Sequence, residues 1–364
     1  GRAAEAEATL RSLLVSAAEE GDRGTAATVV ASLASAQAAQ ARLPEAERLA
    51  ARALRLRRDV LADEHPAVGE ALQALAGIWR SSGRTGKSLQ ALERVLQIQR
   101  GSLPSGHPQI GASLNNLGFL LMEERRLQEA MPVLKEAVQA AVRSLGQGHE
   151  SVASMLLNMA AAHELQGEES QAESVYVRIA KLRAGAAAAA AADGQWRCRY
   201  GKLLHKLGRH GEALETLRTA LTVWRGLGLP PTEGEVMTTV GTLGAVLHAL
   251  GRHSESVDVL RGVASIQGQA LGGRDPRTAQ TVANLGVALH AAGRGEEAMA
   301  YLRQSEVDLE QHLGPTSPQV QAVKQNIEAL ARGPPPDPSA SLLEGLDVSI
   351  EEEEPGALSA GLAD

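Results

Sequence analysis

The chain has 364 residues, of which 44% are hydrophobic, and its formal net charge is −7. Seven aromatic residues and a single cysteine, Cys198, argue against a β-sheet core, an internal disulfide framework and a zinc site of paired cysteines. No apolar run approaches the roughly 18 residues of a membrane span, so we expect no membrane segment.

The first residues, Gly1 to Glu5, contain neither an initiator methionine nor the apolar region of a signal peptide. We therefore expect the chain to be a fragment or a processed form. The single cysteine fits a reducing compartment, so a cytoplasmic location is expected. An organelle is the alternative, because a targeting peptide would already have been removed.

Residues 1–24 are expected to form an N-terminal capping helix. Leu10, Leu13, Leu14 and Ala17 fall on one stripe of that helix, which is typical of an amphipathic segment that covers the end of a helical stack. Gly21 and Asp22 should end it.

A turn signal then recurs about every 42 residues. We call its residues the turn landmarks: Ala41, Gly83, Arg125, Gly167, Gly208, Gly251 and Gly293. A small residue precedes each landmark by seven positions, and another small residue follows it by five. Self-similarity of this length is typical of stacked helix–turn–helix units that bury their apolar faces against one another. We predict four units in residues 25–192 and three in residues 193–318.

The junctions between units carry His-Pro or related pairs, for example His65-Pro66, His107-Pro108 and Asp275-Pro276. Proline is tolerated at the start of a helix, so these pairs are interpreted as helix boundaries rather than metal ligands. The alanine run 186–192 predicts either a lengthened helix or a low-complexity loop. Residues 319–332 should form a C-terminal capping helix.

Residues 333–364 begin with a proline-rich run and hold eight acidic residues but no lysine or arginine. We expect this tail to be disordered. The rest of the chain is close to neutral in charge, which argues against nucleic acid as a partner.

The repeat pattern resembles the tetratricopeptide repeat, and its 42-residue form with His-Pro or Asp-Pro boundaries resembles the repeats of kinesin light chain. The segment His107 to Gly118 carries the similarity most clearly, and residues 156–160 and 282–286 repeat its second part. The resemblance implies an all-α, right-handed superhelical solenoid with helical caps. It also implies that the first helix of each pair lines a concave groove that binds peptides.

Counting from the turn landmarks places a set of polar and apolar residues on that groove. Asn116, Asn158 and Asn284 fall at the same repeat position, and an exposed amide there can both donate to and accept from a peptide backbone. Asn115 and Phe119 are neighbours of Asn116. The alternative is that asparagine merely tolerates a solvated helix face.

The fifth unit adds positive charge at helical spacing, in Arg199, Lys202, His205 and Lys206, with Arg197 and Arg209 nearby. A basic groove would attract acidic peptides, because arginine can hold a carboxylate in two places. The alternative is that these basic residues lie on a solvent-exposed helix face and have no binding function.

Three histidines, His205, His248 and His290, occupy equivalent positions in consecutive units. Repeats about 10 Å apart are too widely spaced for these histidines to share one metal ion, so no metal site is predicted. A pH-sensitive groove is one interpretation of this row, and drift of the repeat sequence is the other.

Several motifs imitate catalytic or nucleotide-binding sites. Residues 81–88 resemble a phosphate-binding loop and residues 293–298 a dinucleotide fingerprint, but both fall on predicted repeat turns with no strand before them. Basic neighbours of Cys198 could lower its pKa, yet no partner histidine is identifiable. We expect no enzyme, no cofactor and no small-molecule substrate.

The sequence thus predicts a non-catalytic scaffold that binds an extended, acidic peptide in its concave groove, and a kinesin-light-chain-like cargo adaptor is the sharper version. The alternative is an assembly factor or subunit of a large complex that binds through its convex face or its ends. Residues 342–354 alternate apolar and acidic character, so they are a candidate internal ligand; a solubilising tail is the competing interpretation.

Overall fold

The computed structural model describes residues 21–184, 191–230 and 232–332, together with positions 9, 10, 12, 13, 15 and 16. Every regular element among these residues is an α-helix, which confirms the all-α prediction. The capping helix expected in 1–24 lies mostly outside the described residues, as do most of the alanine run 186–192 and the whole acidic tail.

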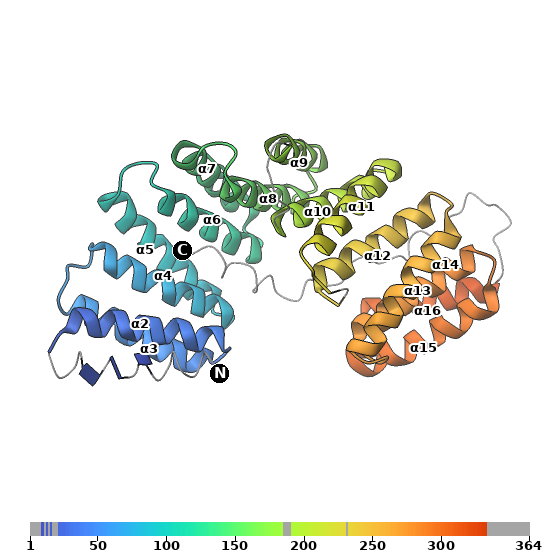
Figure 1. The fold of residues 1–364 in the computed structure, drawn as a ribbon, viewed down its shortest axis with the longest axis horizontal. Helices are drawn as coiled ribbons and strands as arrows, with labels where there is room; N and C mark the ends of the chain where they lie inside the picture. The colour runs from blue at the N-terminus through green and yellow to red at the C-terminus, as the bar shows by residue number, and fades with distance from the viewer. Residues whose placement is uncertain are drawn as a thin grey trace. The chain divides into compact units, whose positions relative to one another are not determined.

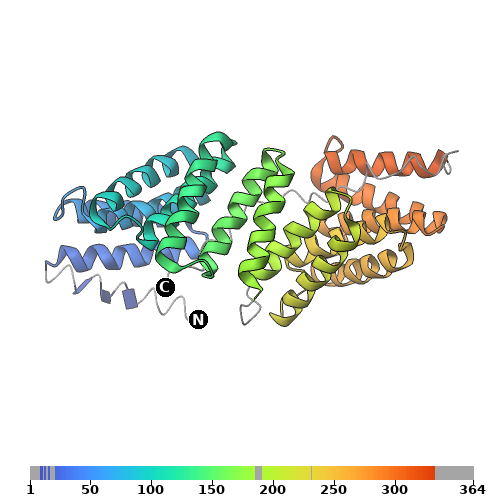
Figure 2. The same ribbon diagram turned by 90° about the horizontal axis from the view of Figure 1, so that it is seen from above.

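The chain divides into two compact units, Gly1–Ala184 and Gly185–Asp364. Each is built from helices joined in pairs by short turns, with neighbouring helices running antiparallel (Figures 1 and 2). The first unit contains α2 Arg23–Ala39, α3 Leu43–Arg58, α4 Pro66–Ser81, α5 Thr85–Ser102, α6 Pro108–Glu123, α7 Leu127–Leu145, α8 Glu150–Leu165 and α9 Glu169–Arg183. The second contains α10 Ala191–Lys206, α11 His210–Gly226, α12 Gly234–Ala249, α13 His253–Ala270, α14 Pro276–Ala291, α15 Gly295–Leu313 and α16 Pro318–Arg332.

The even-numbered helices are the first helices of the repeats, and each odd-numbered helix is the second helix of the preceding one. Each second helix packs on its own first helix and on the first helix of the next repeat within the unit. In the second unit each first helix also touches the next one, from α10 through α12 and α14 to α16, and in the first unit α2 touches α4 and α6 touches α8. The first helices of the second unit therefore form one continuous surface, and so do α6 and α8 in the first unit.

The turns inside the repeats fall at the predicted landmarks. All seven landmark residues have a positive φ, between 57° at Ala41 and 76° at Gly293. The residue after each landmark donates its N–H to a carbonyl five residues earlier, as Arg126 does to Leu121 at 2.8 Å. This bond ends the first helix and satisfies a carbonyl that would otherwise lack a partner.

The boundary residues between repeats cap the helices that follow them. Nδ1 of His65 accepts from the N–H of Ala67 at 3.1 Å, and Oδ1 of Asp275 accepts from the N–H of Arg277 at 2.9 Å. His107 and His149 cap their helices in the same way. The interpretation of these residues as helix boundaries is therefore confirmed, and their side chains serve as N-caps.

The two helices of a pair cross closely because both small residues of the pattern lie at the crossing. The hydroxyl of Ser88 donates to the carbonyl of Ala76 at 2.7 Å, and that of Ser256 donates to Gly244 at 2.9 Å. The small residue five positions after the landmark is at most 1% exposed in every repeat. The small residues of the sequence pattern thus form the contact that holds the two helices of each repeat together.

The fifth repeat differs from the others at its start. Helix α10 begins at Ala191, so the expected division between residues 192 and 193 falls within it. Gly194 lies against the buried ring of Trp224, where a Cβ atom would be only 2.4 Å from the indole. Asp193 is buried as well and accepts from the indole N–H of Trp196 at 3.3 Å.

Within the described residues, none of the helices combines the length and the apolar character that crossing a membrane requires.

The close crossing predicts that Gly118→Val destabilises the chain. A Cβ atom at Gly118 would lie 2.6 Å from Cδ2 of Leu134, and the Leu134 side chain is fully buried, so it cannot move out of the way into solvent. Overpacking of this kind costs about 1–3 kcal/mol of unfolding free energy, measurable by urea unfolding followed with circular dichroism. The matched control is Gly77→Val on α4, where a Cβ atom would meet nothing within 4 Å. Equal effects of the two substitutions would contradict the crossing as the critical contact.

Candidate binding surface

The predicted groove residues all lie on first helices, in two separate sets. Helices α6 and α8 of the first unit carry Asn115, Asn116, Phe119 and Asn158, and helices α10 and α14 of the second unit carry the other six. One repeat position, nine residues before the turn landmark, holds Asn116, Asn158, Arg199, Thr242 and Asn284. Because α6 touches α8, and α12 touches both α10 and α14, equivalent side chains on these helices form rows along the first-helix surface.

Two of the asparagines in the first unit bond to each other. Nδ2 of Asn158 donates to Oδ1 of Asn115 at 2.9 Å, which joins α8 to α6. Among the described residues the side chain of Asn116 makes no hydrogen bond, and all three amides are half-buried. Asn116 therefore keeps both its donor and its acceptor capacity, whereas Asn158 and Asn115 have each used one.

Phe119 stands beside a cation that the sequence analysis did not single out. The guanidinium carbon of Arg80, on α4, lies 5.3 Å from the centre of the Phe119 ring. Arg80 precedes its turn landmark by three positions, as His205 does in the fifth repeat, so the repeat register could have identified it. Phe119 thus contributes an aromatic surface with one face near a positive charge.

The basic residues of α10 and of the turn that follows it fall into two groups, those that bind another group of the chain and those that do not. Arg209 forms a two-pronged salt bridge with Glu212, and Arg197 donates to the carbonyl of Asp193 while lying over the ring of Trp196. Within residues 191–332, apart from 231, Arg199 and Lys202 form no ion pair or side-chain hydrogen bond. Lys202 and Lys206 are exposed and Arg199 is half-buried. The positive charge expected at Arg209 and Arg197 is therefore largely neutralised, whereas that of Arg199 and Lys202 is available.

Asn284 and His290 lie on α14. Nε2 of Gln280 approaches Oδ1 of Asn284 at 3.5 Å, which is a weak hydrogen bond within one helix face. Both Asn284 and His290 are half-buried.

The three equivalent histidines form a row that is joined by histidines of the second helices. Nδ1 of His205 lies 3.0 Å from Nδ1 of His210, and the rings of His248 and His253 have centroids 5.0 Å apart. Burial lowers the pKa of His205 and of His248, and the positive charge of neighbouring histidines lowers it further. For His205 those neighbours are His210 and His248, and for His248 they are His253 and His290. His210 and His253 were missed because their effect depends on the turn geometry, although their spacing of five residues is visible in the sequence.

Cys198 is not part of an accessible site. Its side chain is 7% exposed, and burial raises the pKa of its thiol despite the nearby Arg199 and Lys202. The expectation that basic neighbours would lower this pKa is wrong, because desolvation of the thiolate outweighs their attraction.

The two motifs that imitate nucleotide-binding loops lie on repeat turns. Gly83 and Arg84 connect α4 to α5, and Gly293 and Arg294 connect α14 to α15, with helices on both sides. The described residues also contain no cluster of three or more histidine, cysteine, aspartate or glutamate side chains suited to a metal ion.

Comparisons with known proteins support the repeat pattern. A family model described as tetratricopeptide repeat matches residues 24–101, 109–184 and 235–306, and a second model of the same description matches residues 197–223. None of the curated proteins compared with the chain matches it significantly.

Solved structures with a similar fold include three repeat proteins. A Podosopora anserina protein assigned as a kinesin light chain, with nearly identical TPR-like repeats, is 22% identical, with a TM-score of 0.50 over 57% of this chain and 98% of that one. BtubC (BKLC) from P. vanneervenii is 18% identical, with a TM-score of 0.56 over 63% and 93%. A signal transduction ATPase with a tetratricopeptide repeat sensor from Pyrococcus horikoshii is 13% identical, with a TM-score of 0.60 over 85% and 45%. At these identities the similarity concerns the fold.

The histidine row predicts that the stability of the chain falls as the pH decreases from neutrality. His205 and His248 have folded-state pKa values below the ordinary value of 6.5, so the unfolded chain binds more protons as the pH falls through that value. Replacing both with glutamine should reduce the loss of melting temperature between neutral and mildly acidic pH. The control is His65→Asn, which keeps a capping side chain and leaves the row intact. The same pH dependence in all three proteins would exclude the row as its source.

Proposed function

Because the chain belongs to the tetratricopeptide repeat family, we propose that it is a non-catalytic scaffold whose first-helix surfaces bind an extended, acidic peptide. Proteins built from these repeats generally act as protein-interaction scaffolds. The observation that carries the proposal is the pair of cations Arg199 and Lys202, which have no carboxylate partner among the described residues. They lie on a surface that is continuous with Asn284 of the same unit.

Each candidate residue has a distinct role in this proposal. Arg199, Lys202 and Lys206 meet the acidic side chains of the peptide, because charge-assisted hydrogen bonds to carboxylates are the strongest polar contacts available on such a surface. Asn284 holds the peptide backbone, and His205 and His290 border its path. In the first unit, Asn115, Asn116 and Asn158 hold a backbone segment, and Phe119 supplies an apolar contact.

A more specific version of the proposal is a cargo adaptor similar to kinesin light chain. It is supported by the similar folds of the Podosopora anserina protein assigned as a kinesin light chain and of BtubC (BKLC), which are 22% and 18% identical to this chain. The Pyrococcus horikoshii ATPase carries its tetratricopeptide repeats as a sensor, and 45% of that protein is covered. We propose a cytoplasmic location for the chain, which fits its single cysteine.

The competing proposal is a subunit or assembly factor of a large complex, which binds through its second-helix face or its ends. The two proposals differ in where substitutions matter. An adaptor loses its partners when the first-helix surface is changed, whereas an assembly subunit loses them when the second helices or the terminal helices are changed.

The adaptor proposal predicts that Asn116→Ala and Lys202→Glu each remove a discrete set of partners. The measurement is affinity capture from native lysate with quantitative mass spectrometry, after circular dichroism has shown equal folding. Arg303→Glu is the matched control, because Arg303 is an exposed cation on the second helix α15 without an ion pair among the described residues. Partners that are lost with Arg303→Glu but kept with the other two variants would favour the assembly subunit.

The tail hypothesis gives a further prediction. Residues 342–354 lie outside the described residues, and we propose that they compete with an external acidic peptide for the first-helix surfaces. A tethered ligand acts at an effective concentration that reaches about the millimolar range. Deletion of residues 333–364 should therefore tighten the affinity for a synthetic acidic peptide, as measured by fluorescence anisotropy. An unchanged affinity would leave the tail as a solubilising segment.

A further inference from the structure

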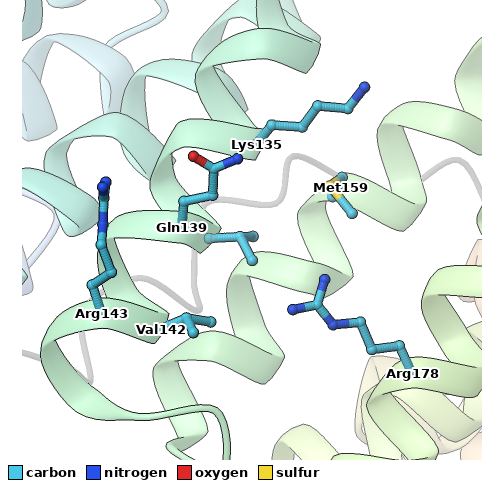
Figure 3. A pocket seen from close by; sticks show the side chains of 7 residues that line it. Lys135, Gln139, Val142, Arg143, Met159 and Arg178 are labelled. Atoms are coloured by element: carbon cyan, nitrogen blue, oxygen red, sulfur yellow. The ribbon is translucent and has the colours of Figure 1, made fainter.

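A pocket of about 450 Å³ lies in the first unit, and its lining is drawn mostly from second helices (Figure 3). None of its lining residues is among those proposed above. Its walls come from α7 and α9, and one residue of α8 lies between them. The lining residues are Lys135, Val138, Gln139, Val142, Arg143, Met159 and Arg178. The volume is within the range of pockets that hold ligands or inserted side chains.

The pocket exists because of how the second helices are held. Helices α7 and α9 both pack on α8, which lies between them in the stack, so the space between their outer parts is not filled by a direct contact. Met159, the lining residue that belongs to α8, is buried. Most other repeats have leucine at the same position, and methionine is more adaptable in shape.

Three cations surround the pocket, and none has a partner within residues 21–184. Lys135, Arg143 and Arg178 are all exposed and form no ion pair or hydrogen bond through their side chains there. In Figure 3, Arg143 and Arg178 lie on opposite sides of Val142, and Lys135 extends beyond Gln139. Three unengaged positive charges around one pocket form an attractive site for negative charge.

The acidic residues of α7 do not neutralise this charge. Glu129 forms a two-pronged salt bridge with Arg126, and Glu136 accepts from Arg100 at 2.7 Å. None of the seven lining residues is acidic. The positive charge at the pocket is therefore left for a ligand.

Part of the pocket lining is apolar. Val142 is half-buried and keeps part of its apolar surface exposed, and Val138 and Met159 are buried beside it, so an apolar group placed here is surrounded by apolar atoms. A free anion would use the cations but gain nothing from this apolar patch. An acidic protein segment uses both, because it can place an apolar side chain over the patch and its carboxylates beside the arginines.

We propose that this pocket is a second docking site, which binds an acidic protein segment through one apolar side chain flanked by carboxylates. The apolar side chain covers Val138, Val142 and Met159. Arg143 and Arg178 hold carboxylates on either side of it, and Lys135 meets a third acidic group. The site is independent of the first-helix surfaces, so the chain can hold two partner segments through different faces.

The methyl group of Met159 provides a direct test. The full chain is labelled with carbon-13 at its methionine methyl groups, and the Met159 resonance is assigned with the Met159→Leu variant. The probe is a short synthetic peptide in which leucine and isoleucine alternate with glutamate and aspartate. We expect the Met159 resonance to shift in a saturable manner, and we expect higher salt to weaken the binding.

Two altered probes test the chemistry of the ligand. One peptide replaces the acidic residues with their amides and the other replaces leucine and isoleucine with serine, and we expect both to bind at least about tenfold more weakly. Inorganic phosphate is the small-anion probe. If phosphate saturates the same shift and the serine peptide binds as well as the original, the pocket is a simple anion site and the proposal is wrong.

Two double variants test the location. Lys135→Glu with Arg178→Glu should abolish the shift, because it reverses two cations that have no ion-pair partner in the described part of the chain. Arg52→Glu with Arg55→Glu is the control, since it makes the same charge change at exposed arginines of the second helix α3 that also form no ion pair there. Equal loss of binding in the two variants, or no binding of the original peptide, would overturn the proposal. Variants Asn116→Ala and Lys202→Glu should leave this shift unchanged, which separates the pocket from the first-helix surfaces.

Discussion

The structure depends on the close crossing of the two helices in each repeat. Small residues on both helices meet there, and in two repeats a serine hydroxyl bonds directly to the opposite backbone, as Ser88 does to Ala76. Leu134 of the third repeat fills the space that the missing side chain of Gly118 leaves. Because this contact fixes how the second helix lies on the first, it also fixes which side chains of the first helix remain on the surface. Small residues that are themselves buried at the crossing therefore determine which side chains are available to bind a partner.

Charge is distributed in a similarly ordered way. The second helices of four repeats are each preceded by a capping arginine that forms a two-pronged salt bridge with the glutamate three residues later: Arg126, Arg209, Arg252 and Arg294. The glutamates lie in the first turn of their helices, where negative charge is favourable. These exposed pairs add little stability individually. Their consequence for binding is larger, because these four arginines near the turns are neutralised by their glutamates, whereas Arg199, Lys202 and the pocket cations are among those that form no ion pair within the described residues.

The periodic features of the fold were predictable from the sequence, and the contacts between neighbouring repeats were not. Turn landmarks such as Gly83 and capping residues such as His65 depend on local conformation, which leaves a repeated signature. The bond between Asn115 and Asn158 depends on the separation of two first helices, and the pairing of His205 with His210 depends on the path of the turn. The pKa of the Cys198 thiol is raised by burial, whereas the sequence predicted a lowered one. The sequence shows the neighbouring charges but not the extent of desolvation.

The arrangement of the first unit has a consequence for its partners. Helices α6 and α8 touch directly, whereas α7 and α9 are held through α8. The joint between the third and fourth repeats therefore carries a specific polar link, the bond from Asn158 to Asn115, between its first helices, and an open pocket between its second helices. Partners that bind at these two places contact the same joint between repeats.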